Sequence, residues 1–265
     1  MPASSPSGPS PVDSIRLVER FERPAANYTF KATSLPGHLL HLVVAGRVEQ
    51  TCNGRRQQLA PGTVVWYHED EWVEGRVLAA PWIYYSVNFA APTLAPPEFD
   101  ARLQAGRADL QPVFAALHAA WLLPPSRERD YRVQACLLDL LAALAPAASG
   151  PAAVMPDGRR WWEVEAWARQ HIDRPISLPD ICRQFNLSPN TLARACRAAV
   201  GLPPMRRLKQ IRLSLARGLV HYSDLNMTEI ALRVGYGRVH EFSRDYRKAH
   251  GRPPTVDRAG ARDPR

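Results

Sequence analysis

Several features that would assign a function directly are scarce or missing in this chain of 265 residues. Its four cysteines are far apart in the sequence: Cys52, Cys136, Cys182 and Cys196. This spacing argues against a disulfide framework and a cysteine zinc site, and it fits a reducing cytoplasm, where we expect the protein to be located. No apolar run is long enough to span a membrane. Neither a nucleophile motif nor a Gly-rich phosphate loop is present.

Positive charge is abundant, and it is concentrated in one part of the chain. Residues 157–265 contain 21 Lys and Arg against 11 Asp and Glu, whereas residues 1–156 contain 13 against 14. The whole net charge of +9 therefore comes from the C-terminal part. Such a basic segment is typical of proteins that bind the phosphate backbone of duplex DNA.

The basic part contains one pattern twice. The first copy, "DICRQFNLSPNTLARACRAAVGLPP", begins at Asp180, and the second, "EIALRVGYGRVHEFSRDYRKAHGRPP", begins at Glu229. Each copy predicts a helix, a short turn and a second helix that ends at Gly before Pro, which is the order of a helix-turn-helix. A duplicated unit is stronger evidence than a single copy. A generic helical repeat that only buries a core is the alternative.

Between the copies, residues 204–221 predict one amphipathic helix with Leu208, Ile211, Leu215 and Leu219 on its apolar face. Such a helix would hold the two second helices for insertion into successive major grooves, about 34–36 Å apart.

Side chains on the predicted outer faces are candidate DNA contacts. The predicted base contacts are Asn190, Thr191 and Arg194 in the first copy and Arg238, His240, Ser243 and Arg244 in the second. The predicted phosphate contacts are Arg197, Arg206, Arg207, Lys209, Arg247 and Lys248. On the connecting helix, Arg212 lies on the same predicted face as Arg206, Arg207 and Lys209 and is also offered to phosphates. For Arg194 and Arg244, a buried structural pair or a phosphate clamp remains an alternative.

Residues of about 160–256 resemble the DNA-binding domain of the AraC/XylS family of bacterial transcription regulators. The run "IALRVGYGRVHEFSRDYRKAHGRPP" is similar to the family pattern I-A-x-x-V-G-F, F-S-R-x-F-[RK] and G-x-[ST]-P. The resemblance implies a seven-helix domain that binds two major-groove segments and controls promoters. Gly237, Glu241 and Pro253 depart from the pattern. Because Glu241 would repel phosphate or accept from a cytosine amino group, an unusual base preference is expected.

The first part of the chain predicts a small β-barrel or sandwich. Its β-like runs are "LLHLVVAG", "RVEQTC", "TVVWYH" and "WIYYSVNF", punctuated by turn dipeptides between residues 39 and 89. Two helices are predicted at about 110–121 and 128–144. The runs "HLVVAGRVE", "LAPGTVVWYH" and "PWIYYSVNF" resemble the cupin-like sensor domain of AraC-type regulators. That resemblance implies that the helical hairpin carries dimerisation, so we expect a homodimer.

The resemblance also implies a small-molecule effector inside the barrel. Alternation along the strand places Trp82, Tyr84 and Ser86 on one face, and His41 would join them from an earlier strand. Aromatic walls with a few polar groups suit sugars and other small ligands. The alternative is a barrel core filled with aromatic side chains. Ala45 stands where a sugar-binding family member has Arg, which argues against an identical ligand.

No cofactor or metal is expected. A cupin metal site needs clustered His and carboxylate ligands, and His38, His41, His68 and Glu69 include no His-x-His pair. We therefore expect an effector-responsive regulator that contacts promoter DNA and RNA polymerase. Two alternatives remain. One is a metal-dependent cupin enzyme fused to a DNA-binding domain, and the other is a constitutive DNA binder whose barrel only dimerises.

The predicted organisation has five segments. They are a disordered leader at 1–14, a cupin-like sensor and dimerisation domain at 15–144, a linker at 145–158, a DNA-binding domain at 159–256 and a disordered tail at 257–265. The Pro/Ser-rich leader lacks the apolar core of a secretion signal.

Overall fold

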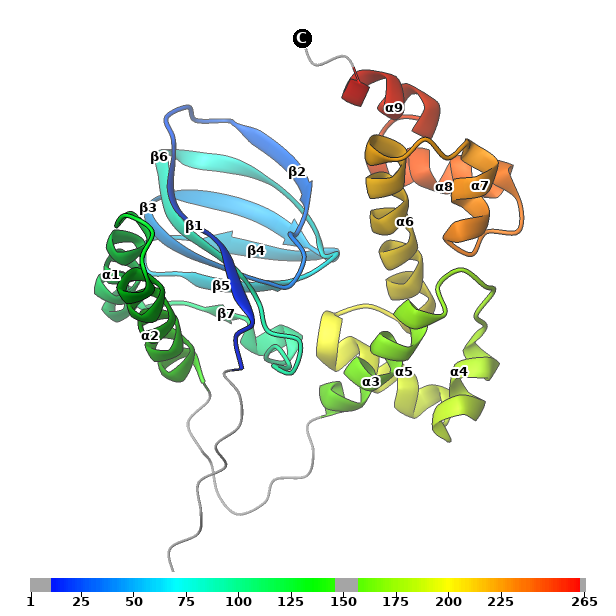
Figure 1. Ribbon diagram of the computed structural model, residues 1–265, viewed down its shortest axis with the longest axis horizontal. Coiled ribbons are helices and arrows are strands. Elements are labelled where there is room, and N and C mark those ends of the chain that lie inside the picture. Colours follow the sequence, from blue (N-terminus) through cyan, green and yellow to red (C-terminus); the bar gives the residue numbers. More distant parts are fainter. Residues whose placement is uncertain (1–10, 146–156, 263–265) are drawn as a thin grey trace, which may run out of the picture. The chain divides into compact units, whose positions relative to one another are not determined.

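The computed structural model describes residues 11–145 and 157–262. The chain divides into two compact units, Met1–Val154 and Met155–Arg265 (Figure 1). No helix among the described residues has the length and apolarity needed to cross a membrane. The first unit is an antiparallel sheet with a helical hairpin and the second is all helical, which confirms the predicted fold class.

The N-terminal unit is built on one seven-stranded antiparallel sheet. Its strands are β1 (Ser14–Arg23), β2 (Thr29–Thr33), β3 (His38–Cys52), β4 (Arg55–Leu59), β5 (Val64–His68), β6 (Trp72–Ala90) and β7 (Leu103–Gln104). The order is β1-β6-β3-β5-β7, while β2 pairs with β6 and β4 with β3. The predicted runs therefore lie on β3, β5 and β6, but β1, β2, β4 and β7 were not predicted.

The long strands β3 and β6 bend where their pairing shifts register, between Val43 and Val48. Gly46 lies in this bend with φ +82°, and a Cβ there would lie 2.5 Å from the carbonyl oxygen of Pro81. Only glycine tolerates both conditions. The bend lets β2 and β4 pair with the far halves of β6 and β3, so the sheet folds over on itself.

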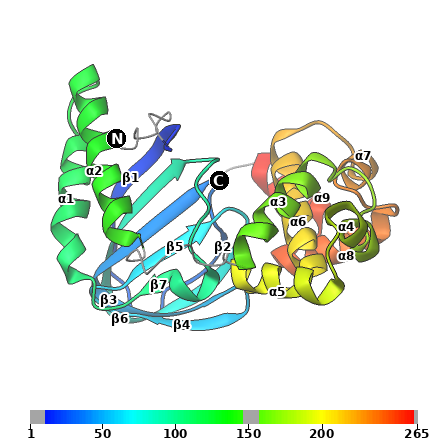
Figure 2. The same cartoon turned by 90° about the horizontal axis from the view of Figure 1, so that it is seen from below.

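The two faces of this sheet carry separate apolar clusters. The inner face holds Val43, Val48, Tyr67 and Tyr84, among others, and the outer face holds Leu40. The helices α1 (Gln111–Trp121) and α2 (Arg127–Leu144) pack side by side on the outer face (Figure 2). Two 3₁₀ turns, Phe99–Ala101 and Ala108–Leu110, lead into this hairpin. The alternation predicted for β6 is confirmed, since Trp82 and Tyr84 face inward whereas Tyr85 and Val87 face the helices.

The C-terminal unit consists of helices on either end of one long connector (Figure 1). The helices are α3 (Asp157–Gln170), α4 (Leu178–Phe185), α5 (Pro189–Val200), α6 (Pro204–Tyr222), α7 (Met227–Arg233), α8 (Val239–His250) and α9 (Pro254–Arg262). Helices α3 and α5 pack on the first half of α6, and α9 packs on its second half. The predicted connecting helix and both helix-turn-helix pairs are present.

Three expectations at the segment ends need correction. The predicted tail at 257–265 begins inside α9, and Asp257 is fully buried. The predicted leader is too long, because Val12 is buried and β1 begins at Ser14, while residues 1–10 lie outside the described part. The predicted linker is too long at its end, since α3 begins at Asp157; residues 146–156 are not described.

The predicted apolar stripe of α6 is also wrong in one position. Leu208 and Ile211 are buried, whereas Leu215 is exposed. The first half of α6 packs on α3 and α5, but the second half buries a different face through Leu213, Ala216 and Val220. A single stripe cannot serve both halves, because the two groups of helices lie on different sides of the connector.

Candidate nucleic-acid interface and ligand site

Helix α5 begins with a strong local signal. The Oγ of Ser188 accepts a hydrogen bond from the backbone N–H of Thr191 at 3.1 Å, and Pro189 occupies the first turn. Asn190 and Arg194 are exposed, and Thr191 is half-buried, with its hydroxyl 2.9 Å from that of Ser188. Asn190 and Arg194 therefore point to solvent near the helix N-terminus, where a major-groove helix contacts bases.

Helix α8 occupies the corresponding place in the second copy. Gly235 has φ +77°, and a Cβ there would lie 2.4 Å from the carbonyl oxygen of Ile172, so the turn before α8 requires glycine. Arg238 and His240 are exposed and Ser243 is half-buried. The side chain of Arg244 is 75% exposed. Arg194 and Arg244 are thus not a buried structural pair.

An open depression of about 550 Å³ follows the basic face of α8. It is lined by Ser243, Arg244, Arg247, Lys248, Gly251 and Pro253. Next to Arg244 on the helix, the carboxylate of Asp245 lies 3.7 Å from the Nε of Arg244 and 2.6 Å from the Nζ of Lys209. The structure therefore brings the predicted contacts of α8 together with Lys209 of α6.

Arg207 is not available to DNA, contrary to the prediction. Its side chain is fully buried, and its Nε and Nη2 donate to the two carboxylate oxygens of Glu165 at 2.9 and 2.7 Å. Its Nη1 donates to Gln210 at 3.1 Å, while the indole of Trp161 donates to Glu165 at 2.8 Å. Arg207 lies one turn before the buried Ile211, so the periodicity of α6 contained the signal that it faces the core.

The other predicted phosphate contacts are exposed. They are Arg197 at the end of α5, Arg206 and Lys209 on α6, and Arg247 and Lys248 at the end of α8. Arg212 is half-buried and donates to the carbonyl of Arg174 at 2.8 Å, so it holds the loop after α3. These exposed basic side chains are separate from the buried hydrogen-bonded cluster around Glu165.

The four predicted effector residues lie together on the inner face of the sheet. Trp82 and Tyr84 are neighbours on β6 with ring centroids 4.3 Å apart, and the ring of His41 lies 4.9 Å from that of Tyr84. Ser86 is buried and pairs in register with His41. Loss of solvent lowers the pKa of His41 to about 4, so this imidazole is neutral at pH 7. The site therefore combines stacked rings with neutral hydrogen-bonding groups.

Strands that sequence reasoning missed add further residues to this inner face. Phe21 of β1 contacts Tyr84 at 5.4 Å between ring centroids, and Phe30 of β2 contacts Trp82 at 5.4 Å. Arg23, at the end of β1, pairs in register with Trp82. The alternation of "RFER" was the available signal for β1. Because three of these four residues are charged, the sequence did not indicate that this strand places side chains on the inner face.

His38 was a possible metal ligand, and the structure gives it another role. The indole N–H of Trp66 donates to its Nδ1 at 3.1 Å, so its Nε2 carries the proton and donates to the carbonyl of Ala91 at 3.2 Å. Burial lowers the pKa of His38 to about 4. Because both ring nitrogens are engaged, His38 is neutral and has no lone pair to offer a metal.

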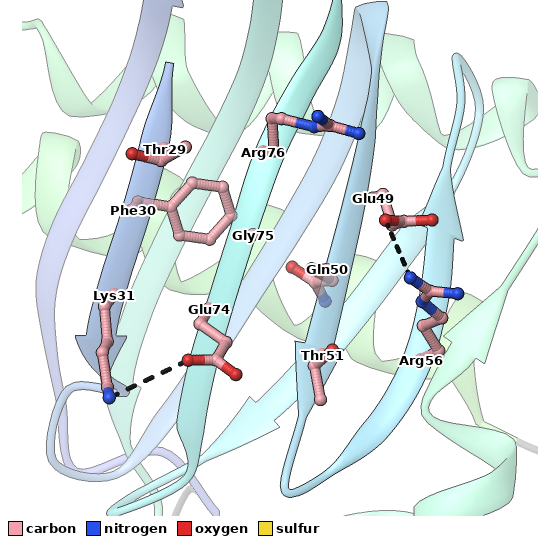
Figure 3. Close-up of a pocket in the computed structure, with 10 residues that line it drawn as sticks. All are labelled: Thr29, Phe30, Lys31, Glu49, Gln50, Thr51, Arg56, Glu74, Gly75 and Arg76. Carbon is pink, nitrogen blue, oxygen red and sulfur yellow. Dashed lines mark ion pairs between the residues drawn. The ribbon is translucent and has the colours of Figure 1, made fainter. Parts of the chain in front are cut away.

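A second depression, of about 410 Å³, lies across β2, β6, β3 and β4 (Figure 3). It contains the cross-strand ion pairs Lys31–Glu74, at 3.9 Å, and Arg56–Glu49, at 3.5 Å. Phe30 lies over Gly75, whose Cβ position would be 2.6 Å from the ring. Sequence reasoning singled out none of these residues, because cross-strand charge pairs need the strand register.

Two family models match the chain. A model described as an AraC-like ligand binding domain matches residues 17–154, more than half of the sequence, and one described as a helix-turn-helix domain matches residues 181–260. The chain belongs to the AraC/XylS family of transcription regulators. The resemblance found in the sequence is thereby confirmed for both units.

Curated relatives of this AraC/XylS-family chain match its C-terminal unit. The HTH-type transcriptional activator RhaS of Klebsiella pneumoniae (strain 342) is 37% identical over 95 residues, which are 36% of this chain and 34% of that protein. RhaS of Salmonella schwarzengrund is 36% identical over 98 residues, 37% of this chain and 35% of that protein. The match spans about a third of the length of these relatives.

Solved structures of ToxT from Vibrio cholerae share the fold of this AraC/XylS-family chain. One, at 1.65 Å resolution, has a TM-score of 0.58 at 11% identity and covers 92% of this chain and 97% of that one. ToxT from Vibrio cholerae O395 has a TM-score of 0.57 at 11% identity, covering 92% and 96%. At this identity the likeness concerns the fold.

Proposed function

We propose that this protein is a sequence-specific DNA-binding transcription regulator whose N-terminal unit binds a small-molecule effector. The observation that carries the proposal is the pair of helices α5 and α8, each with exposed polar and basic side chains, joined by the single helix α6. Such a connector sets the spacing of two recognition helices for successive major grooves. The base contacts are Asn190, Thr191, Arg194, Arg238, His240, Ser243 and Arg244, and the phosphate contacts are Arg197, Arg206, Lys209, Arg247 and Lys248.

The effector site is the inner face of the sheet around His41, Trp82, Tyr84 and Ser86. Effector binding changes the placement of the DNA-binding units, and through them promoter occupancy and contact with RNA polymerase in the cytoplasm. The naming of RhaS as an activator supports activation as the direction of control.

The regulator acts as a homodimer through α2. This helix exposes an apolar stripe in which Tyr131 and Leu138, 69% and 37% exposed, are joined by the exposed Ala135 and Ala142. These positions follow the i, i+4, i+7, i+11 spacing of one helical face. A second copy of the same stripe covers this surface by two-fold pairing, which is the usual symmetry of soluble oligomers.

Selection of genomic fragments bound by the purified full-length chain tests the proposal. We expect enrichment of a few fragments upstream of genes, each with two half-sites about one helical turn apart. Recovery of random fragments in proportion to their abundance would contradict sequence-specific regulation. The genes next to the enriched fragments identify candidate effectors, and each candidate is then tested for a shift in the thermal stability of the protein.

A constitutive regulator is the second candidate, because the inner face is densely filled with aromatic rings. In that case no candidate effector shifts the melting temperature or the affinity for the enriched fragments, although DNA binding itself is specific. Metal analysis of the same preparation addresses the enzyme alternative, since a stoichiometric transition metal would favour a metal-dependent cupin.

A further inference from the structure

Arg23 is a cation placed among aromatic rings at one end of the sheet. It lies two residues after Phe21 on β1, and therefore on the same inward side of the strand. Its guanidinium carbon is 5.6 Å from the ring centroid of Phe21 and 5.6 Å from that of Tyr28. Burial raises the pKa of Tyr84, and the nearby positive charge of Arg23 opposes that rise.

No carboxylate of residues 11–145 or 157–262 forms an ion pair with Arg23, whereas several other arginines of this unit have one. Arg20 lies 3.8 Å from Glu22 on the same strand, and Arg56 lies 3.5 Å from Glu49. Arg102 is buried with Glu71 at 2.5 Å. A half-buried guanidinium whose described contacts are with two aromatic rings keeps donors for an external anion, and its planar fork matches a carboxylate.

The rings next to Arg23 form one continuous stack. Centroid distances are 6.4 Å from Tyr28 to Phe30, 5.4 Å from Phe30 to Trp82 and 4.3 Å from Trp82 to Tyr84, and the ring planes of each pair lie within 25° of each other. Tyr28 is 41% exposed, so the stack reaches the protein surface there. The exposed ring of Tyr28 can therefore pack against a flat, apolar guest.

The stack also holds an unsatisfied donor. Trp82 is 5% exposed, and its indole N–H has no hydrogen-bond partner within the described residues. A buried N–H without a partner costs free energy comparable with a lost hydrogen bond, so an acceptor on a bound molecule would stabilise it. Trp82 is the register partner of Arg23, which places the two donor-bearing residues side by side on β1 and β6.

We infer that this cluster binds a planar aromatic carboxylate, with the carboxylate on Arg23 and the ring against Tyr28 at the exposed end of the stack. The inference rests on the proposed function, because it names the chemical class of the effector. A monosaccharide fits the cluster poorly, since its several hydroxyl groups would face rings with few hydrogen-bonding partners. Arg23 recognises the charge, and the indole N–H of Trp82 receives an acceptor of the guest.

Isothermal titration calorimetry of the full chain with 2-naphthoate and 2-naphthamide tests the inference, because the two probes share the ring and differ in charge. We expect the carboxylate to bind about tenfold or more tightly than the amide, as a charge-assisted hydrogen bond is stronger than a neutral one. Arg23→Gln should remove this preference and leave the amide affinity nearly unchanged. Arg20→Gln, on the same strand but paired with Glu22, is the matched control and should keep it.

Arg23→Lys keeps the charge and provides a second variant if Arg23→Gln does not fold; it should retain part of the carboxylate preference. Equal affinity of the wild-type chain for the two probes, absence of 2-naphthoate binding, or full preference in Arg23→Gln would overturn the inference. The same proteins are assayed on the enriched DNA fragments. Specific DNA binding without a carboxylate preference removes the inference alone, whereas loss of specific DNA binding removes the proposed function.

Discussion

Two adjacent arginines of α6 have opposite environments. Arg206 is exposed, whereas Arg207 is fully buried against Glu165, which also accepts from Trp161 and Arg169. A buried carboxylate that loses its guanidinium partner is left as an uncompensated charge. The pair therefore separates a residue that supports the fold from one that is free to contact DNA.

Arg207→Ala should lower the free energy of unfolding of the C-terminal unit by about 3–5 kcal/mol. Arg206→Ala, its neighbour and matched control, should change it by less than about 0.5 kcal/mol. Urea unfolding of residues 155–265 measures both. Equal stability of the two variants would show that the bidentate contact with Glu165 does not hold α3 to α6.

Arg244 and Arg206 are the proposed base contact and the proposed phosphate contact whose effects can be separated. Arg244→Ala should cost about 1–3 kcal/mol on the preferred site and relax the preference at one base pair, because its side chain is exposed on a recognition helix. Arg206→Ala should weaken binding to all sequences alike and lower the salt slope by about one. Titration of both variants against the best site and its single-base variants measures these effects. A uniform loss for Arg244→Ala would make it a phosphate contact.

At the scale of elements, a buried carboxylate of α9 faces both α6 and α8. Asp257 accepts from the hydroxyl of Tyr246 at 2.6 Å, and its oxygens lie 2.7 Å from Arg252 and 3.2 Å from His221. Burial alone would raise the pKa of Asp257, but the hydrogen bond of Tyr246 and the neighbouring His221 and Arg252 hold it below its ordinary value. The ionised form is therefore the one that docks the helix.

Because the pKa of Asp257 is depressed in the folded state, its contribution to stability is present above the ordinary aspartate pKa and is lost as pH falls through the folded value. Asp257→Asn should lower the free energy of unfolding at pH 7 by about 1.5–3 kcal/mol, since it removes the charged acceptor of the Tyr246 hydroxyl and the ion pair with the half-exposed Arg252. It should also flatten the fall in stability below pH about 4. Exposed Asp173→Asn is the control, and identical pH profiles for the two variants would contradict the assignment.

The second prediction at the scale of elements concerns the proposed dimer surface on α2. Leu138→Glu places a charge in the middle of the apolar stripe and should convert a dimer into a monomer at micromolar concentration, because a desolvated unpaired charge costs several kcal/mol. Analytical ultracentrifugation measures the mass. Arg132→Ala, on a neighbouring face of α2 where Arg132 pairs with Glu128, is the control and should leave the mass unchanged. A Leu138→Glu protein that stays dimeric would place the interface elsewhere.

At the scale of the whole molecule, the two units differ in charge and should differ in salt response. Residues 157–265 carry the entire positive excess, so this fragment should retain DNA binding, whereas residues 1–156 should show none. If roughly 6–10 phosphates are contacted, affinity should fall about a thousandfold or more between about 50 and 200 mM salt. Fluorescence anisotropy with a labelled duplex measures both fragments. DNA binding by the N-terminal fragment would contradict the division of roles.

Much of this protein was determined by the sequence alone, because the deciding interactions are local. Ser188 caps α5 and Gly251 ends α8, and each signal lies within one turn of the helix that it terminates. The alternation of Trp82 and Tyr84 on one strand face is likewise a property of neighbouring residues. Charge and the duplicated pattern then sufficed to predict two helix-turn-helix units and the exposed faces of α5 and α8.

Other features were decided only by tertiary structure, because their partners are distant in the chain. Arg207 meets Glu165 42 residues earlier, so its basic side chain was taken for a surface contact although it neutralises a buried carboxylate. Asp257 lies in a polar C-terminal segment that folds because Tyr246 and Arg252 enclose its charge. Arg23 joins the aromatic stack only through the pairing of β1 with β6, and pairing between distant strands cannot be determined from the pattern of either strand alone.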